Sequence, residues 1–295
     1  MDWSADRRLQ WRMLLALVLT LAGYAVLGWI VLSVLSTTMA LVVCAVFAVV
    51  ILTSVSQADY IAYWATNAIA IDREQYPLLY DTTERLARQA DLPVPPVAVI
   101  PSDEPNALSA GTGNRTVVCV TTGLLRTLDD DELEAVLAHE LAHLKNDDST
   151  VLTVAGFPMV VSAVALSTAR RTFTFGSYLI GLPFLLGTYL LFVGLPVYLA
   201  SLPGTLVLSR YREYAADRGA VAITGDPYAL ASALATLHGE PTPPDADLRT
   251  VAGFNAFCIV PTDSLSPFST HPPTHRRIAR LREQFVEETS GAAST

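Results

Sequence analysis

Hydrophobic residues fill four long stretches of the chain, and polar residues gather in two blocks that follow the second and the fourth stretch. The first two stretches, Met13 to Leu35 and Met39 to Gln57, hold no charged residue, and only residues 36–38 separate them. The later two cover Thr150 to Ala169 and Phe175 to Leu208. Each stretch is long enough to cross the hydrocarbon core of a bilayer, which takes about 20 residues. The pattern therefore predicts an integral membrane protein with about four transmembrane helices.

Charged residues beside these stretches suggest an orientation. Arg7, Arg8 and Arg12 precede the first stretch, and an excess of arginine and lysine marks the cytoplasmic end of a transmembrane helix. The first two helices then form a hairpin that returns the chain to the cytoplasm, where both polar blocks lie. Arg170 and Arg171 conflict with this topology, because it places them on the outer side. The alternative for the two later stretches is a pair of buried core helices, or a hairpin that enters the membrane only in part.

The first polar block, 58–149, predicts a small sheet packed on a helix. Ile71 to Ala90 has a helical pattern, and the proline-rich segment after it ends that helix. Val97 to Ile100 and Thr116 to Thr121 are rich in β-branched residues and predict strands. Between them, the glycine-containing segment Thr112 to Arg115 (TGNR) is typical of a hairpin turn. Asp129 to Asp148 predicts the helix on which this sheet packs.

The second polar block is mostly helical in its pattern. Arg210 to Thr224 continues the fourth apolar stretch as a helix. Asp226 suits the N-cap of a short helix over Pro227 to His238. Residues 240–273 contain seven prolines and predict a long mobile loop. Thr274 to Glu288 predicts a final charged helix.

Composition supports the membrane assignment and narrows the range of partners. Of the 295 residues 52% are hydrophobic, and the mean hydropathy of +0.40 is too high for an ordinary soluble protein. The net charge is −9, and 26 of the 28 acidic residues follow Gln57. A basic surface is absent, which excludes nucleic acid as a partner. The three cysteines, Cys44, Cys119 and Cys258, have no spacing typical of a disulfide framework or a metal site.

One motif in the predicted helix carries the chemistry: His139-Glu140-Leu141-Ala142-His143. Residues four apart share one face of a helix, so the two imidazoles can bind one metal ion. Glu140 lies beside that ion and can accept a proton from a water bound to it. This H-E-x-x-H arrangement is typical of zinc peptidases, although an amphipathic helix can also carry it by chance.

A catalytic zinc ion usually has three protein ligands and keeps one position for water. The motif helix supplies no third histidine, so the third ligand must come from elsewhere in the chain. The best candidate is Glu213. Asp217 follows one helical turn later on the same face, where its carboxylate can accept the second N–H of a ligand histidine. Spacing alone fits a solvated charged surface equally well.

These motifs together resemble the HtpX-type membrane zinc metalloproteases, which are relatives of the CAAX prenyl endopeptidases. The resemblance covers nearly the whole chain. Two of its motifs are much more specific than the zinc motif: Ser209 to Asp217 (SRYREYAAD), and Ser269 to Pro273 followed by Arg277 (STHPP…R). The resemblance implies a mainly α-helical integral membrane protein with a cytoplasmic α+β zinc protease domain of the gluzincin type, which carries a small sheet.

The resemblance also implies roles for individual residues. One Zn²⁺ per chain is held by His139, His143 and Glu213, with Glu140 as the catalytic base. In the family, the His-Pro motif and the arginine after it lie near the active site.

The resemblance therefore implies that His271 and Arg277 lie near the active site. The oxyanion of the transition state needs a hydrogen-bond donor nearby, and His271, Arg277 and Arg210 are all candidates. His271 can instead cap the open position of the zinc in a resting state.

The family pattern further implies an edge strand that pairs with the substrate backbone, formed by Asn106, Ala107, Leu108, Ser109, Ala110 and Gly111. Unpaired N–H and C=O groups at a sheet edge bind an added peptide strand with little demand on its sequence. An ordinary hairpin arm fits the same residues.

The predicted organisation is an N-terminal transmembrane hairpin (1–57), a first catalytic part (58–149), a second transmembrane pair (150–208), a second catalytic part (209–288) and a disordered tail (289–295). With a helical rise of about 1.5 Å per residue, His143 lies roughly 9 Å from the third apolar stretch and Glu213 roughly 7.5 Å from the fourth. A centre so close to the lipid bilayer favours membrane polypeptides as substrates. We therefore expect a multi-pass endopeptidase of the cell membrane that acts in quality control of misfolded membrane proteins.

Two other interpretations stay open. A CAAX-type processing peptidase would use the same chemistry on prenylated tails, but its family has a larger set of enclosing helices. A membrane transporter or scaffold would use the histidines only for packing. Charged residues inside the membrane would favour a transporter, and the four apolar stretches carry almost none.

Overall fold

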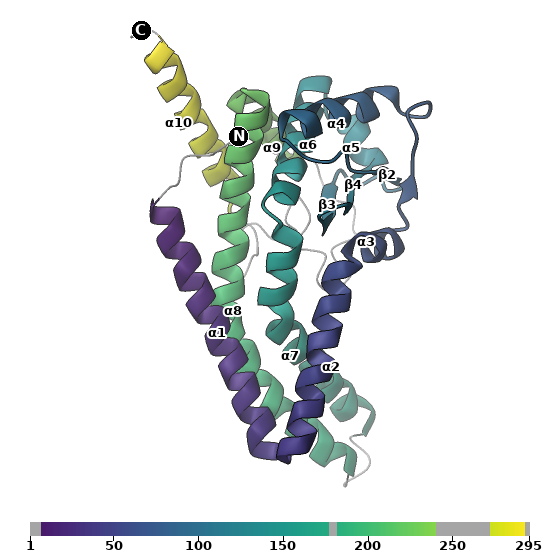
Figure 1. Cartoon of the computed structure of the whole chain (residues 1–295), viewed down its shortest axis with the longest axis vertical. Helices are drawn as coiled ribbons and strands as arrows, with labels where there is room; N and C mark the ends of the chain where they lie inside the picture. The colour runs from purple at the N-terminus through teal and green to yellow at the C-terminus, as the bar shows by residue number, and fades with distance from the viewer. Residues whose placement is uncertain (1–6, 177–181, 240–271, 293–295) are drawn as a thin grey trace. The chain divides into compact units, whose positions relative to one another are not determined.

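The computed structural model of the protein describes residues 7–176, 182–239 and 272–292, which form a mainly helical chain with one small sheet (Figure 1). The helices are α1 (Arg7–Val34), α2 (Thr37–Ser56), α3 (Ala58–Thr66), α4 (Pro77–Gln89), α5 (Thr122–Thr127), α6 (Asp130–Lys145), α7 (Asp148–Gly176), α8 (Leu182–Thr224), α9 (Pro227–Gly239) and α10 (Thr274–Ala292). The strands are β1 (Ile69–Ala70), β2 (Val97–Ile100), β3 (Ala107–Thr112) and β4 (Arg115–Thr121).

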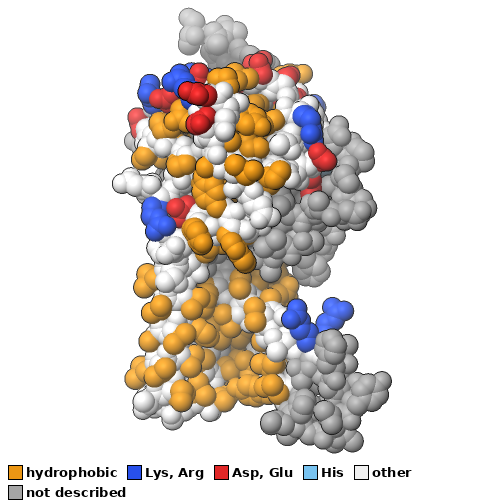
Figure 2. Space-filling model, turned by 90° about the vertical axis from the view of Figure 1, so that its right-hand side faces the viewer, with side chains coloured by type: hydrophobic (Ala, Val, Ile, Leu, Met, Phe, Trp, Pro, Cys, Tyr) orange, Lys and Arg blue, Asp and Glu red, His pale blue; other side chains and the backbone are white. Residues whose placement is uncertain are grey.

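The chain divides into two compact units. We call residues 5–53 and 151–208 the apolar unit, and residues 54–150 and 209–295 the polar unit. Hydrophobic side chains cover the face of the apolar unit seen in Figure 2. Helices α2, α7 and α8 begin in one unit and end in the other, so the backbone passes between the units within helices.

Within the described residues, three helices are long and apolar enough to cross a membrane: Thr37–Ser56, Asp148–Arg171 and Leu186–Thr224. The corresponding apolar part of α1 is shorter, Val18–Val34. The sequence pattern predicts four crossings; three of these helices are long and apolar enough by this measure, and the crossings themselves stay predictions.

Polar groups inside the apolar unit find partners close by. Pro158 lies inside α7 and has no N–H, so the carbonyl of Val154, four residues earlier, loses its helical partner. The Tyr24 hydroxyl of α1 donates to that carbonyl at 2.6 Å. Helices α1 and α8 also approach closely, because a Cβ on Gly23 would lie 2.7 Å from Ser201 Oγ. Small residues at such a crossing let helix backbones pack against each other.

The polar unit is built around a four-stranded sheet in the order β1-β2-β4-β3. Strands β2 and β4 are parallel, and the other two pairs are antiparallel. Thr112 pairs with Arg115, which leaves Gly113 and Asn114 as a two-residue hairpin turn. Gly113 has φ +59, as expected for the first central residue of a type II′ turn. The predicted hairpin is confirmed, and among the described residues β3 pairs only with β4 and is an edge strand.

Both faces of the sheet are covered, because successive residues of a strand point to opposite faces. One face packs against α6 through the buried side chains of Val97, Val99, Ala107, Val118 and Val120, and α4 and α9 join the same core from the sides of α6. The other face packs against Ala62 of α3 through Ala98, Ile100, Leu108, Ala110, Val117 and Cys119. The first core positions α6, the helix of the zinc motif, directly on the sheet.

Two helix boundaries differ from the sequence prediction. Helix α4 begins at Pro77 and not at Ile71, because Asp72 Oδ1 accepts the N–H of Gln75 at 3.1 Å and holds a turn before the helix. Proline is favoured at the first helical position. Helix α10 continues past the predicted end, as far as Ala292, since residues 289–292 contain no proline to end it.

The short helix after α8 has the predicted cap. Asp226 Oδ1 accepts the N–H of Tyr228 at 2.8 Å and that of Ala229 at 3.1 Å, which starts α9. All but the last two residues of the predicted loop 240–273, and the last three residues of the predicted tail, lie outside the described residues.

Candidate metal centre

Helix α6 carries the H-E-x-x-H motif and begins with a complete capping box. The Asp129 side chain accepts the N–H of Glu132 at 2.8 Å, and the Glu132 carboxylate accepts the N–H of Asp129 at 3.3 Å. The second oxygen of Glu132 accepts the hydroxyls of Ser232 at 2.7 Å and Thr236 at 3.0 Å, both in α9. These contacts fix the start of α6 against α9.

His139 and His143 lie one turn apart on the buried face of α6. His139 is 0% exposed and His143 is 8% exposed. Their Nε2 atoms are 3.1 Å apart, and their ring planes make an angle of 83°. The two ring nitrogens therefore face a common point, as the ligands of one metal ion do.

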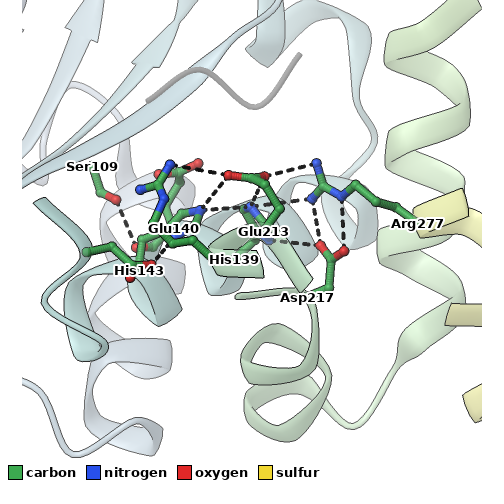
Figure 3. A network of polar contacts seen from close by, with 9 residues as sticks. Ser109, His139, Glu140, His143, Glu213, Asp217 and Arg277 are labelled. Carbon is green, nitrogen blue, oxygen red and sulfur yellow. Dashed lines mark hydrogen bonds and ion pairs between the residues drawn. The ribbon is translucent and has the colours of Figure 1, made fainter. Parts of the chain in front are cut away.

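Glu213 of α8 reaches the same point (Figure 3). Its Oε2 lies 3.6 Å from His139 Nε2, and its Oε1 lies 3.6 Å from His143 Nε2. One ligand atom from each of the three residues lies within 4.8 Å of the other two. A tetrahedral zinc ion with bonds of about 2.0–2.1 Å separates its ligand atoms by roughly 3.3–3.4 Å. The three side chains thus fit a tetrahedral metal site that keeps one further position.

A buried carboxylate holds the second nitrogen of His139. Asp217 Oδ1 lies 3.2 Å from His139 Nδ1. Asp217 accepts two hydrogen bonds from Arg277 of α10, from Nε at 3.0 Å and from Nη2 at 2.6 Å. Outer contacts of this kind fix the orientation of a ligand imidazole.

The charges of this network shift the pKa of its members. Burial lowers the pKa of His139, but the hydrogen bonds to Asp217 and Glu213 outweigh burial and raise the pKa to about 9. Burial raises the pKa of Asp217, but Arg277 and His139 outweigh it and hold that pKa below its usual value. A histidine binds a metal ion as a neutral imidazole, so binding of a metal by His139 would release a proton.

His143 has a carboxylate partner of its own. Asp148 Oδ2 lies 2.6 Å from His143 Nδ1. The sequence pattern predicts a helix that continues to Asp148, but α6 ends at Lys145 and Asp147 has φ 54. The chain turns there and α7 starts at Asp148, which brings its side chain back to the histidine. The available signal was the run Asn146-Asp147-Asp148, since these residue types favour helix ends and caps.

Two guanidinium groups flank Glu213. Arg277 Nη1 lies 3.2 Å from Oε2, and Arg212 Nη2 lies 3.3 Å from Oε1. Each carboxylate oxygen therefore faces one imidazole and one guanidinium. The alternative of a solvated charged surface would leave Arg212 exposed, but this residue is only 5% exposed. Its position next to Glu213 was the one signal for this contact.

Glu140 is 1% exposed, and its Oε2 has no hydrogen-bond partner among the described residues. Its backbone carbonyl accepts the Ser109 hydroxyl at 3.0 Å, which joins the edge strand β3 to α6. Cys119 of β4 packs in the cluster on the α3 side of the sheet. Burial and the nearby Glu140 carboxylate raise its pKa to about 12.

Comparison with known proteins identifies the family. A model of Peptidase family M48 matches residues 73–285. The chain belongs to peptidase family M48.

Relatives of this M48 peptidase are described as HtpX proteases. The chain is 44% identical over 238 residues to "Protease HtpX homolog 2" of Methanosarcina mazei, which covers 78% of the chain and 80% of the relative. It is 39% identical over 291 residues to "Protease HtpX homolog 1" of Streptomyces coelicolor, which covers 95% of the chain and 93% of the relative. It is 42% identical over 244 residues to "Protease HtpX homolog" of Moorella thermoacetica, or 78% and 80% of the two chains. The protein is therefore an HtpX-type membrane metalloendopeptidase, and its family implies a bound metal.

The structure of this M48 peptidase brings several distant predicted residues to the motif helix. Glu213, Asp217 and Arg277 all lie within 3.6 Å of a motif histidine. Arg210 is partly exposed on α8, and His271 lies outside the described residues.

The predicted substrate strand of the M48 peptidase is largely β3. Asn106 precedes this strand, where its N–H donates to Thr121 Oγ1 at 2.9 Å and its carbonyl accepts the Thr121 N–H at 2.9 Å. Gly111 has φ +105, and a Cβ there would lie 1.9 Å from the carbonyl oxygen of Arg115. Only glycine fits that position, which shapes the end of the strand before its hairpin turn.

Proposed function

We infer that the chain is a zinc-dependent endopeptidase in which His139, His143 and Glu213 hold one Zn²⁺ and Glu140 is the general base. The observation that carries this proposal is the convergence of two imidazole nitrogens and one carboxylate, at separations of 3.1 and 3.6 Å, in the interior of the polar unit.

The donor set favours zinc over the common hard cations. Two neutral imidazoles with one glutamate are a ligand set of zinc peptidases, whereas Mg²⁺ and Ca²⁺ prefer oxygen ligands. Zinc bound there would polarise the scissile carbonyl and lower the pKa of a water toward about 7.

Glu140 is placed to move the proton. Its Oε2 has no hydrogen-bond partner among the described side chains, so it is available to accept a proton from the attacking water. The same carboxyl group can then donate this proton to the leaving amine. The Ser109 hydroxyl fixes the backbone at Glu140, which limits how far this base can move from the metal ligands.

Arg277 has contacts that support a positioning role. Its Nε and Nη2 donate to Asp217, and its Nη1 lies 3.2 Å from Glu213. Because these N–H groups are already bound, we assign Arg277 the role of holding Glu213, the third ligand, and Asp217, the partner of His139. His271 and Arg210 then stay as the candidates for the donor to the oxyanion.

The register of β3 indicates how a peptide substrate would bind. In an antiparallel pair, alternate residues direct both backbone groups to the partner strand. Thr121 N–H donates to the Asn106 carbonyl, and two residues on, Leu108 faces β4 in the same way. The backbone groups of Ala107 and Ser109 then face the free edge. We propose that these backbone groups pair with the substrate, which binds as an added strand. The Ser109 side chain at this edge is the one that bonds to α6.

The membrane helices support substrates that reside in the membrane. Helix α7 carries Asp148, and helix α8 carries Glu213, and both helices contain candidate membrane spans. Arg7, Arg8 and Arg12 precede the apolar part of α1, which supports a cytoplasmic polar unit. We propose that the enzyme cleaves exposed cytoplasmic segments of misfolded membrane proteins and serves their quality control.

The decisive experiment replaces Glu140 by Gln in the full chain, purified and reconstituted with zinc. We expect cleavage of a reporter membrane protein to fall by about 10²–10⁴-fold, while zinc measured by mass spectrometry stays at one ion per chain. The matched control is Glu134→Gln, because Glu134 lies on the same helix and pairs with Arg85 on the surface. The control should keep both zinc and activity.

Full activity of the Glu140→Gln enzyme would refute the role of Glu140 as the base. Loss of zinc in that variant would refute the claim that Glu140 acts in catalysis without a part in zinc binding. The substrate preference is tested separately with soluble casein. Equal cleavage of casein and of the membrane reporter would contradict the membrane-substrate proposal and leave the zinc chemistry intact.

A further inference from the structure

Helix α3 has one face that the catalytic machinery does not use. On its inner side, Ala62 is 0% exposed and Thr66 is 4% exposed, and Ala62 packs on the sheet. On the opposite side Tyr60 is 63%, Ile61 37% and Trp64 77% exposed. Residues three and four apart share a face of a helix, so these three side chains form one stripe, which we call the outer stripe.

The outer stripe contains no charged side chain. Asp59, the single acidic residue of α3, lies off this stripe and pairs with Arg115 of β4 at 3.4 Å. This ion pair and the packing of Ala62 fix the rotation of α3 on the sheet. The apolar side is thereby directed away from the core, and adjoining exposed apolar residues of this kind mark a contact with a partner.

The position of α3 along the chain indicates the partner. Helix α2 is a candidate membrane span with hydropathy 2.7. It ends at Ser56, α3 begins at Ala58, and only Gln57 separates the two helices. An extended residue spans at most about 3.6 Å, so covalent connection keeps the first turn of α3 within roughly 10 Å of the end of α2. Each interfacial layer of a bilayer is roughly 5–7 Å thick.

We propose that the outer stripe of α3 lies in the membrane surface, with Tyr60 and Trp64 among the phospholipid headgroups and Ile61 toward the acyl chains. Tyrosine and tryptophan combine an apolar ring with a polar tip and are enriched in this layer of membrane proteins. A short amphipathic helix that follows a membrane span satisfies its apolar side by lying along the interface.

This contact orients the sheet of the polar unit. Helix α3 packs on one face of β2, β3 and β4, and α6 packs on the other. An anchor at α3 therefore sets the direction of the edge strand relative to the lipid surface. The proposal concerns the membrane contact alone and stands independently of the metal and of the base.

The test follows the fluorescence of Trp64 in vesicles. The chain has four tryptophans, and replacing Trp3, Trp11 and Trp29 by Phe leaves Trp64 alone. In phosphatidylcholine vesicles we expect a blue-shifted emission, loss of most of that emission with lipids brominated close to the headgroup, and protection from acrylamide.

The matched control carries the same three changes with Trp64→Phe and Arg88→Trp. Arg88 lies on the surface of α4 with its side chain 72% exposed. Its tryptophan should show the emission of an indole in water, resist the brominated lipid and be quenched by acrylamide.

Two results would overturn the proposal. One is a Trp64 that acrylamide quenches and brominated lipid does not. The other is a Trp64 that neither agent quenches, which would indicate a second copy of the chain or another protein on the outer stripe.

A measurement on the unaltered sequence protects the test from a misfolded variant. The native protein is reconstituted with a phospholipid that carries a diazirine near its headgroup, irradiated and mapped by peptide mass spectrometry. We expect lipid adducts on α3 and none on α4. Adducts confined to the membrane spans would contradict the proposal.

Discussion

The two units of the protein differ in how far along the chain their side-chain hydrogen bonds reach: those described in the apolar unit join residues within four positions of each other, except for Tyr24 with Val154, whereas those around the candidate metal centre join distant segments. In the apolar unit, the Ser201 hydroxyl donates to the carbonyl of Val197, four residues earlier. In the polar unit, the Ser109 hydroxyl donates to the carbonyl of Glu140, 31 residues away. The first bond forms in any helix that contains the serine, whereas the second forms only when the tertiary structure is complete.

The difference follows from the surroundings of each unit. A helix in an apolar medium must satisfy its polar groups within itself or with a neighbouring helix. Bonds within one helix do little to select one arrangement of helices. In the polar unit, Arg277 bonds to Asp217 across 60 residues of sequence, so the buried charges specify how α8 and α10 meet. The candidate metal centre of the polar unit therefore depends on a network of long-range polar contacts, whereas the helices of the apolar unit meet through close packing and the single bond from Tyr24 to Val154 among the described contacts.

The largest effect is expected from removing the distant metal ligand. Glu213→Ala should weaken zinc binding by more than the roughly 10–100-fold that loss of an outer contact causes, because an oxygen ligand itself is lost. Competition with a chelator of known affinity measures the change. Glu134→Ala, on the surface of α6, is the control and should leave the affinity unaltered. An unchanged affinity in the Glu213 variant would remove the third ligand from the assignment.

The next effect concerns the long-range ion pair. Arg277→Met leaves the Asp217 carboxylate without its guanidinium and leaves Glu213 with that of Arg212 alone, and breaking a buried pair in this way costs about 3–5 kcal/mol. Chemical unfolding of the purified protein, followed by a probe in the polar unit, measures this loss. Arg85→Met is the matched control, since its pair with Glu134 is exposed and such pairs contribute about 0–1 kcal/mol. Equal losses in the two variants would contradict the contrast between long-range and surface contacts.

The smallest effect is expected in the apolar unit. Tyr24→Phe removes the hydrogen bond to the Val154 carbonyl, and such bonds between membrane helices contribute about 0.6 kcal/mol on average. In a Pro158→Ala background the new N–H of residue 158 satisfies that carbonyl, so the same change should cost less. A double-mutant cycle of unfolding free energies measures the coupling. An identical cost in both backgrounds would show that the hydroxyl does not replace the bond that proline removes.

Local pattern was enough to predict much of the fold. The apolar runs, the hairpin turn at Gly113, the cap at Asp226 and the helix that carries His139 and His143 all depend on neighbours within a few residues. Short elements were missed. The two-residue strand β1 and the nine-residue helix α3 are too brief for a periodic pattern, and their existence depends on the sheet that they contact.

The surroundings of the candidate site were harder to predict. Glu213 and Asp217 were candidates because one turn separates them, yet spacing alone could not distinguish a buried pair from a charged surface. Asp148 was missed because the helix was continued across Asp147, whose left-handed conformation redirects the chain. Arg212 was missed because its burial is a property of the folded unit and leaves no local signal.

The order of the network along the chain has a consequence for biosynthesis. Arg277 contacts His139 across 138 residues of sequence, and its helix α10 is synthesised after the other described elements of the site. A nascent chain that has already inserted its membrane helices still lacks the guanidinium that pairs with Asp217 and with one oxygen of Glu213. The contacts around the candidate metal centre can therefore form in full only after α10 has been synthesised.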